Sequence, residues 1–195
     1  MPQNQLIPIT AEICKSTERI SQGDIFKDIT IIEDFENVGS EMHLRKLYFP
    51  FVICLNQDCD LNSDKRASDN GQFNKDCRLL HFLVAPVFTV DSFLASDYWG
   101  NIFADVNTIG KKGFGKVENN EVPRYHFLHF PNDSGITHDF IIDFKHFFTV
   151  SSRYMYKNMD KRLCSIDVLY RELINQRFAN YLARIGLPGK EGERL

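Results

Sequence analysis

The sequence predicts a mainly β fold: a small curled sheet or barrel with an amphipathic α-helix packed against it at the C-terminal end. Three observations lead to this prediction. Several apolar segments of strand length are separated by turns and long loops. No regular helical pattern connects them, which argues against a doubly wound parallel sheet. Near the C-terminus, apolar side chains repeat instead with a helical period.

The composition fits a globular protein with one core. A chain of 195 residues, 43% apolar and with 17 phenylalanines, can bury enough surface for one domain with an appendage. The formal net charge is -3 and the isoelectric point is near 6.1. Broad, non-specific nucleic-acid binding needs a basic surface, so this class of function is disfavoured.

The cysteines and the N-terminus favour a reduced, cytoplasmic protein. The five cysteines are scattered and odd in number, and they form no CxxC pair. The first 20 residues lack the basic and apolar regions of a secretory signal, and no apolar run is long enough to cross a bilayer. We expect no membrane contact, no cofactor and no metal.

The first half of the chain predicts two strands. A weakly helical segment at 11–20 is followed by a strand at 25–32 and a polar loop at 33–45, with Gly39 and Ser40 near its tip. The run LYFPFVICL from Leu47 to Leu55 is apolar at both alternating registers, which predicts a central strand buried on both faces.

A long polar loop is then expected at 56–76, followed by a strand at 78–90 in which Pro86 favours a bulge or an edge position. Further strands are expected at 125–130 and 140–150. A tight hairpin or flexible loop is expected around 110–116.

The C-terminal helix begins after Ser165, a good N-cap residue. Its apolar positions repeat with a 3.6-residue period as far as Ile185, and Gly186 ends it. The predicted organisation is an N-terminal extension at 1–20, a β domain with long loops at 21–150, and a helical segment at 151–195 that packs on the domain or on a partner.

The order of three motifs resembles the PemK/MazF family of toxin ribonucleases, which are SH3-like barrels. These motifs are Gly23-Asp24-Ile25-Phe26, the segment Phe49-Pro50-Phe51-Val52-Ile53-Cys54-Leu55-Asn56, and the strand Leu83-Val84-Ala85-Pro86-Val87-Phe88-Thr89. The resemblance covers residues 20 to 90 and implies an SH3-like barrel in a toxin–antitoxin or defence setting.

The sequence also departs from the family pattern. The family's catalytic arginine precedes the proline of the second strand, where this chain has Phe49. Arg45 and Lys46 lie several residues away, while Thr89 matches the place of the family's catalytic threonine. The resemblance therefore implies the fold more than the ribonuclease activity, because the group that stabilises the phosphate in the transition state is displaced.

The cluster Gln57-Asp58-Cys59-Asp60, at the end of the predicted central strand, is the first candidate site. Cys59 is a candidate nucleophile with His81 as its base, although the adjacent aspartates disfavour the thiolate. A half-buried thiol in a turn explains the same residues. Oxygen ligands at 58–69 are spaced as in a calcium loop, and Cys59, Cys77 and His81 allow a zinc site, but an acidic surface loop and core packing are the preferred interpretations.

A second candidate site is the segment Gly110-Lys111-Lys112-Gly113-Phe114-Gly115-Lys116, which could hold phosphate or stack on a base. Its spacing does not fit a P-loop, and such segments are commonly solvated loops. The histidines at 126, 129 and 146 lie beside aromatic residues, so structural roles are preferred for them.

The favoured function is a binding or regulatory module. A protein partner is expected, RNA or DNA is a second option, and a homodimer is left open. Its contacts would use Gln57, Asp60, Lys111, Lys112 and Lys116. One alternative is an endoribonuclease with a rebuilt site that uses Arg45, Asp58 and Thr89. The other is a cysteine hydrolase that uses Cys59 and His81.

Overall fold

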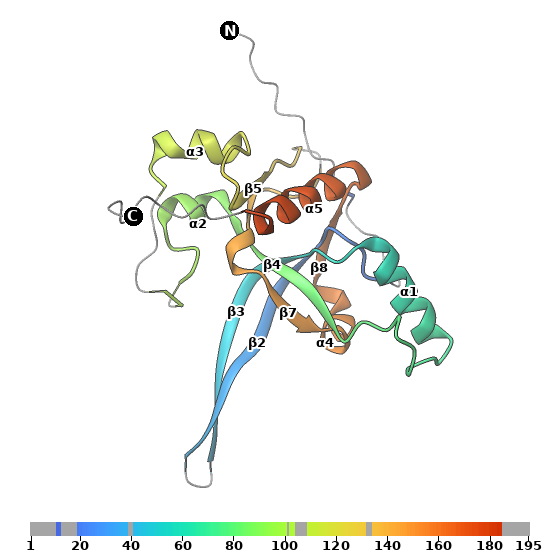
Figure 1. The fold of residues 1–195 in the computed structure, drawn as a ribbon. Coiled ribbons are helices and arrows are strands. Elements are labelled where there is room, and N and C mark those ends of the chain that lie inside the picture. The colour runs from blue at the N-terminus through green and yellow to red at the C-terminus, as the bar shows by residue number, and fades with distance from the viewer. Residues whose placement is uncertain are drawn as a thin grey trace, which may run out of the picture.

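The computed structural model describes residues 11–12, 19–38, 41–100, 102–103, 109–131 and 134–184. One antiparallel eight-stranded sheet forms its centre, in the order β1-β8-β2-β3-β4-β6-β5, with β7 also paired to β4 (Figure 1). The mainly β fold with a C-terminal helix is confirmed. Among the described strands this order is open, because β1 and β5 end it without pairing to each other.

The longest strands form a hairpin, β2 (Asp24–Val38) and β3 (Glu41–Cys54). They pair along their whole length, from Ile25–Ile53 at the body to Val38–Glu41 at the far end. The outer half leaves the body as a two-stranded arm (Figure 1). The prediction of a loop at 33–45 is therefore wrong, because residues 33–38 and 41–45 are strand. Residues 39–40 lie outside the described residues.

Strand β4 (His81–Thr89) is central and pairs with β3 through Val84–Val87. On its other side it pairs with β7 through 81–84 and with β6 through 87–89. Pro86 lies between these two neighbours, where its missing N–H costs no ladder bond on that side. Pro86 thus occupies neither the expected bulge nor an edge strand.

The strand predicted at 140–150 is divided into β6 (Phe140–Asp143), the 3-10 turn η1 (Phe144–His146) and β7 (Phe148–Ser151). Strand β5 (Tyr125–Leu128) pairs with β6, close to its prediction. Strand β8 (Arg162–Ile166) pairs with β2 and with the short β1 (Ala11–Glu12). The C-terminal segment therefore contributes a strand to the same sheet.

Two predicted loops are helices instead. Helix α1 (Asp58–Asp69) occupies most of the loop predicted at 56–76, and its buried residues Leu61, Asp64 and Ala67 share one face at three-residue spacing. Helix α3 (Lys111–Glu118) replaces the loop predicted around 110–116, although it contains two glycines. The remaining short helical elements are α2 (Val90–Ala95), α4 (Ser152–Lys157) and η2 (Met159–Lys161).

The C-terminal helix α5 (Val168–Leu182) begins two residues later than its predicted cap suggests. Ser165 belongs to β8, and Asp167 caps the helix by accepting a hydrogen bond from Leu169 N at 3.0 Å. Helix α5 buries Ile174 and Phe178 against the body. Its predicted end at 185–186 lies outside the described residues, as does most of the helix predicted at 11–20.

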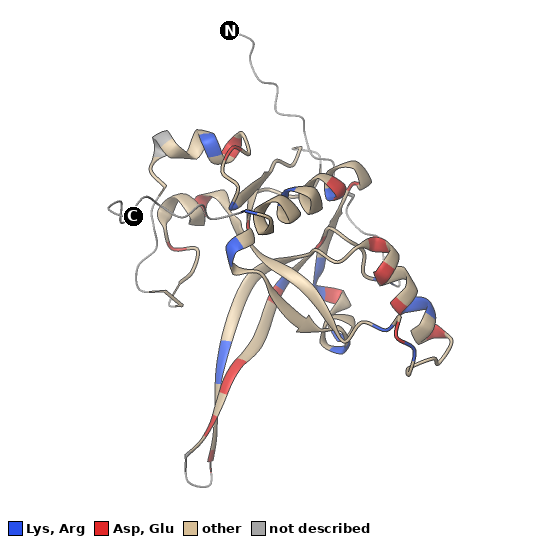
Figure 2. Ribbon diagram, viewed as in Figure 1, with Lys and Arg blue, Asp and Glu red and all other residues tan. Residues whose placement is uncertain are grey.

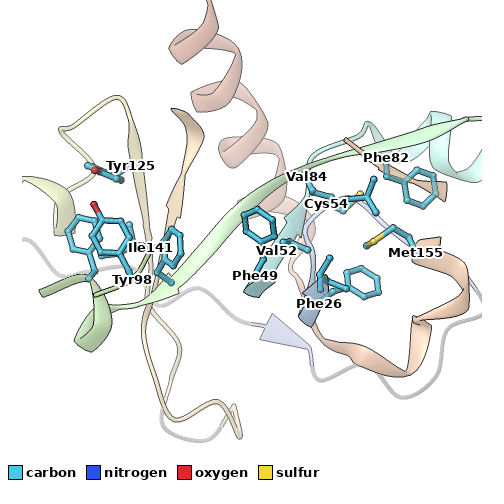
Figure 3. Close-up of a cluster of buried hydrophobic side chains, with 14 of the residues drawn as sticks. Phe26, Phe49, Val52, Cys54, Phe82, Val84, Tyr98, Tyr125, Ile141 and Met155 are labelled. Carbon is cyan, nitrogen blue, oxygen red and sulfur yellow. The ribbon is translucent and has the colours of Figure 1, made fainter. Parts of the chain in front are cut away.

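The core consists of two apolar clusters, one on each side of β3. Val52 and Cys54 belong to the first, which runs from Tyr98 and Tyr125 at one end to Phe82 and Met155 at the other (Figure 3). Ile53 and Leu55 belong to the second, which also contains the two buried residues of α5. The burial on both faces that was predicted for 47–55 is confirmed for residues 52–55, whereas Tyr48 within the same run is exposed. In the described part of the chain, every helix is too short or too polar to cross a membrane.

Candidate functional site

The cluster at 56–60 connects three elements of the fold. Asn56 accepts a hydrogen bond from Leu83 N at 2.7 Å and ties the end of β3 to β4. Asp58 N donates to Gln22 Oε1 at 3.1 Å, and Gln22 N donates back to Asp58 Oδ1 at 3.3 Å. These bonds use the side chains of Asn56 and Asp58 to fix the start of α1.

Asp58 also lies between two arginines. Arg19 Nη2 donates to Asp58 Oδ2 at 2.8 Å, and Arg171 Nη1 of α5 lies 3.5 Å from Asp58 Oδ1. Partial burial raises the pKa of Asp58, but the hydrogen bond from Arg19 and the charge of Arg171 outweigh it and hold this pKa below its usual value. Asp58 is therefore a charged structural link and is unsuited to take up a proton near neutral pH.

Cys59 and His81 do not form a catalytic pair. Cys59 is exposed in the first turn of α1, where its Sγ lies 3.6 Å from Gln57 Oε1 and 3.8 Å from Asp60 Oδ1. His81 is exposed at the start of β4. Within the described ranges, no hydrogen bond joins Cys59 to a histidine or a cation, so the hydrolase hypothesis lacks its base.

The Gly-Asp motif that contributes to the family resemblance has a structural role. Gly23 has φ +81°, and a Cβ there would lie 3.0 Å from Arg171 Cβ. Asp24 is fully buried and receives hydrogen bonds from Ser165 Oγ and, at 2.9 Å, from Arg162 Nη1. These contacts tie β2 to β8, so the motif serves the fold.

The three residues of the rebuilt ribonuclease site are not brought together. Arg45 lies on the arm and pairs with Glu33 at 2.7 Å. From Arg45 to the end of β3 is roughly 30 Å of extended chain, and Asp58 lies beyond that end. Thr89 caps α2, where its Oγ1 accepts from Ser92 N at 3.3 Å. The separation of Arg45 from Asp58 removes the geometric basis of this site.

The lysine-rich segment is helical, so the expected anion-binding loop is absent. Lys116 is exposed near the end of α3, whereas the side chains of Lys111 and Lys112 lie outside the described residues. Nowhere in the described ranges do three or more His, Cys, Asp or Glu side chains come close enough to hold a metal ion. The calcium interpretation of 58–69 is also wrong, because that segment is helix α1.

One feature that the sequence analysis missed is the apolar surface of the arm. Phe35 pairs with Leu44, and these two side chains are 63% and 43% exposed. Side chains alternate between the faces of a strand, so every second residue of β3 joins Leu44 on one face. On β2 a bulge at 32–34 keeps Ile32 on that face as well. We call this surface the apolar arm face; its large exposed side chains are Ile32, Phe35, Met42, Leu44 and Tyr48.

The opposite face of the arm is polar. It carries Asp34, Glu36 and His43, and the Arg45–Glu33 ion pair crosses it. Figure 2 shows that acidic positions predominate along β2 and basic ones on β3. Residues 32–48 contain four carboxylates and two cations other than histidine, so the arm is acidic overall. An acidic arm is poorly suited to bind phosphate.

A pocket of about 480 Å³ lies where the arm joins the body. Residues 45–50 of β3 form one side of it, Phe88 of β4 contributes to its lining, and residues 97–100 and Ile102, after α2, complete it. The pocket exists because β3 pairs with β4 only at residues 51–54. Before residue 51, β3 belongs to the arm, whereas β4 continues beyond residue 87 as a partner of β6. The divergence leaves an unpaired edge of β3 beside an aromatic surface.

A buried ion pair supports the wall of this pocket. The Asp143 carboxylate accepts hydrogen bonds from Arg124 Nε at 2.9 Å and from Arg124 Nη2 at 2.6 Å. His146 Nδ1 lies 2.9 Å from the same carboxylate. Burial raises the pKa of Asp143, but its bonds with Arg124 and His146 outweigh it and lower this pKa. The His146 ring packs edge-on against Trp99, with centroids 4.5 Å apart, so the ion pair helps to position a pocket residue.

No protein-family model matches this chain, and no curated protein matches it. Its membership of the PemK/MazF family therefore stays a prediction from three short motifs. Among the described residues, the apolar arm face and the pocket at its base are two surfaces without a clear role in folding.

The apolar arm face has a signal in the sequence. Met42 and Leu44 alternate with Glu41, His43 and Arg45, which is the pattern of a strand with one apolar face. The pocket has no local signal, because it is assembled from three segments that are distant in the chain.

Proposed function

We propose that this protein is a protein-binding module that docks on a partner protein through the apolar arm face. The observation that carries the proposal is that, in the described part of the arm, the five large exposed apolar side chains lie on one face. Half-exposed side chains of this size present on the order of 100 Å² each, or roughly 500 Å² together. The largest apolar patch on a monomer typically measures about 300–600 Å² and is often functional.

The arm's architecture supports the same proposal. An isolated two-stranded hairpin is only marginally stable in water, and the outer part of this one packs on no third strand among the described residues. An apolar face on such an element gains stability when a partner covers it. A partner protein is favoured over a nucleic acid, because the face is apolar and the arm is acidic overall.

The setting is part of the proposal. The family resemblance implies a component of a toxin–antitoxin or defence system, and the scattered cysteines favour the cytoplasm. An arm that recruits another protein suits a binding or regulatory role in such a system. This role requires no catalytic residue, in keeping with the separation of Arg45 from Asp58 and of Cys59 from a base.

The test compares two double variants of the tagged protein in its native cells. Phe35→Ser/Leu44→Ser changes the apolar arm face, and Glu36→Ser/His43→Ser changes the opposite face at the neighbouring ladder pair. We expect the first variant to lose the co-purified partner and the second to retain it. Equal recovery with both variants would contradict the proposal.

A further inference from the structure

The unpaired edge of β3 at the pocket carries backbone groups directed toward the pocket. Thr30 N donates a hydrogen bond to Tyr154 Oη of α4 at 3.3 Å, so the N–H of Thr30 points away from β3. In an antiparallel ladder, two directly opposite residues either both point their N–H and C=O groups toward the partner strand or both point them away from it. Thr30 is directly opposite Tyr48. The N–H and C=O of Tyr48 therefore point away from β2, and so do those of Lys46, two residues along.

These four groups lack partners in the described part of the chain. Strand β4 has already diverged from β3 at Phe51, and no backbone or side-chain hydrogen bond to Lys46 or Tyr48 main-chain atoms occurs among the described residues. A strand edge in this state is a template for another extended segment. Most edges are blunted by covering elements, whereas this edge borders an open pocket.

The pocket beside the edge suits one apolar side chain. Phe49, Phe88, Tyr98 and Trp99 line it, and about 480 Å³ falls within the range of ligand pockets. A segment added to the edge would place one side chain over this lining. Backbone bonds would provide affinity, and the aromatic lining would select an apolar anchor.

Charge indicates the direction of the segment. Lys46 lies at the arm end of the pocket, and its ammonium has no ion-pair partner in the part of the chain that the structure describes. Arg45, beside it, is already paired with Glu33. An antiparallel segment would run from the body toward the arm, so its C-terminal end would lie near Lys46. An acidic residue after the apolar anchor complements this charge.

We infer that the pocket is a peptide-binding site that adds an extended segment of a partner protein, an apolar anchor followed by an acidic residue, to the edge of β3. This site shares Tyr48 with the apolar arm face, but it uses the backbone edge of β3 and the body rather than the side chains of the outer arm. Lys46 and Tyr48 supply the backbone contacts, and residues 97–100 with Ile102 form the opposite wall.

The test uses the purified chain and the capped peptide acetyl-Val-Leu-Val-Glu-amide. Trp99, the only tryptophan in the chain, lines the pocket and reports binding by its fluorescence. We expect saturable binding, weakened about threefold when the glutamate is moved to the N-terminal end. Lys46→Glu should weaken binding of the first peptide similarly, and Lys157→Glu, an exposed lysine on α4, should not.

Two N-methylated forms of the peptide test the strand addition itself. Methylation at one set of alternate residues removes the donors that face the edge and should weaken binding about tenfold. Methylation at the other set should have little effect, because those groups point away. Equal loss with both forms, no binding of the parent peptide, or binding of a uridine pentanucleotide in its place would overturn the inference.

The Phe35→Ser/Leu44→Ser variant separates this inference from the proposed function. It should bind the peptide as the unchanged chain does, because neither residue lines the pocket. Loss of peptide binding in this variant would overturn the independence of the two sites. Loss of the cellular partner with retained peptide binding would support both proposals.

Discussion

Phe35 and Leu44 lie directly opposite each other on the β2–β3 arm, and both are largely exposed on the same face. A cross-strand apolar pair normally stabilises a sheet when a further layer covers it. Here no described element covers it. The pair therefore contributes little to the folded chain alone, and its effect is expected when a partner is present.

Shortening the arm should leave the body folded. Replacing residues 32–46 by Asn-Gly would close the hairpin on the Ile31–Leu47 pair with a favoured two-residue turn. We expect the near-ultraviolet circular dichroism to be unchanged, because both core clusters lie outside the deleted segment. The partner of the proposed function should be lost. Loss of the native spectrum would show instead that the arm is required for folding.

The buried Asp143–Arg124 pair should be essential to the pocket wall. Asp143→Asn leaves the guanidinium, whose side chain is 23% exposed, without its counter-ion. Removing one partner of a buried pair costs roughly 3 kcal/mol or more. Urea denaturation should show this loss, together with a shift of the Trp99 emission.

Asp91→Asn is the matched control for this measurement. Asp91 lies 3.9 Å from His138 in an exposed pair, and exposed pairs contribute little to stability. We expect its urea midpoint to be unchanged. A similar midpoint for both variants would contradict the structural role of Asp143.

The two glycines of α3 should respond in opposite directions to alanine. Gly115→Ala adds a Cβ in open space and should stabilise the protein by about 0.5–1 kcal/mol through helix propensity. Gly113→Ala places its Cβ 2.9 Å from Ile109 Cγ2, so the gain should be lost or reversed. Thermal denaturation of both variants checks this. A Gly113→Ala variant that is more stable than the unchanged chain would show that Ile109 does not pack against this position of α3.

His126 should make the protein less stable in mild acid. Burial, and then the charge of Arg177, lower the pKa of His126 from 6.5 to about 3. Above pH 6.5 the ring is neutral in both states, and below it only the unfolded chain takes up the proton. The free energy of unfolding should therefore fall by about 2 kcal/mol between pH 7.5 and pH 5.

The comparison with His126→Gln isolates this effect. The two proteins differ only at position 126, so the variant should lose about 2 kcal/mol less than the unchanged chain over the same range. Urea denaturation at the two pH values gives both numbers. The same pH dependence in both proteins would mean that His126 is protonated in the folded state.

The comparison of sequence and structure shows which signals are local. The run from Leu47 to Leu55 predicted burial on both faces correctly from Val52 onward, because its apolar side chains occupy both registers, but Tyr48 is exposed on the arm. The arm was missed because charged residues on one face suggested a loop, although apolar residues alternate with them. A period of two, rather than the mean polarity, carried the signal.

Helix α1 was missed for a different reason. Its buried face includes Asp64, which Leu79 N and Tyr156 Oη satisfy through hydrogen bonds at 2.8 and 3.2 Å. A buried aspartate resembles a loop residue in sequence, because its partners lie far away in the chain. The pocket could not be predicted for the same reason: it depends on where β3 and β4 diverge.

The most direct test of the central claim is photo-crosslinking from two adjacent positions on the arm. Benzoylphenylalanine at position 35 lies on the apolar arm face, and at position 36 it lies on the opposite face. After irradiation in native cells, we expect a discrete covalent adduct with a partner protein from position 35 and little or none from position 36. No adduct from position 35, or equal adducts from both positions, would contradict docking through the apolar arm face.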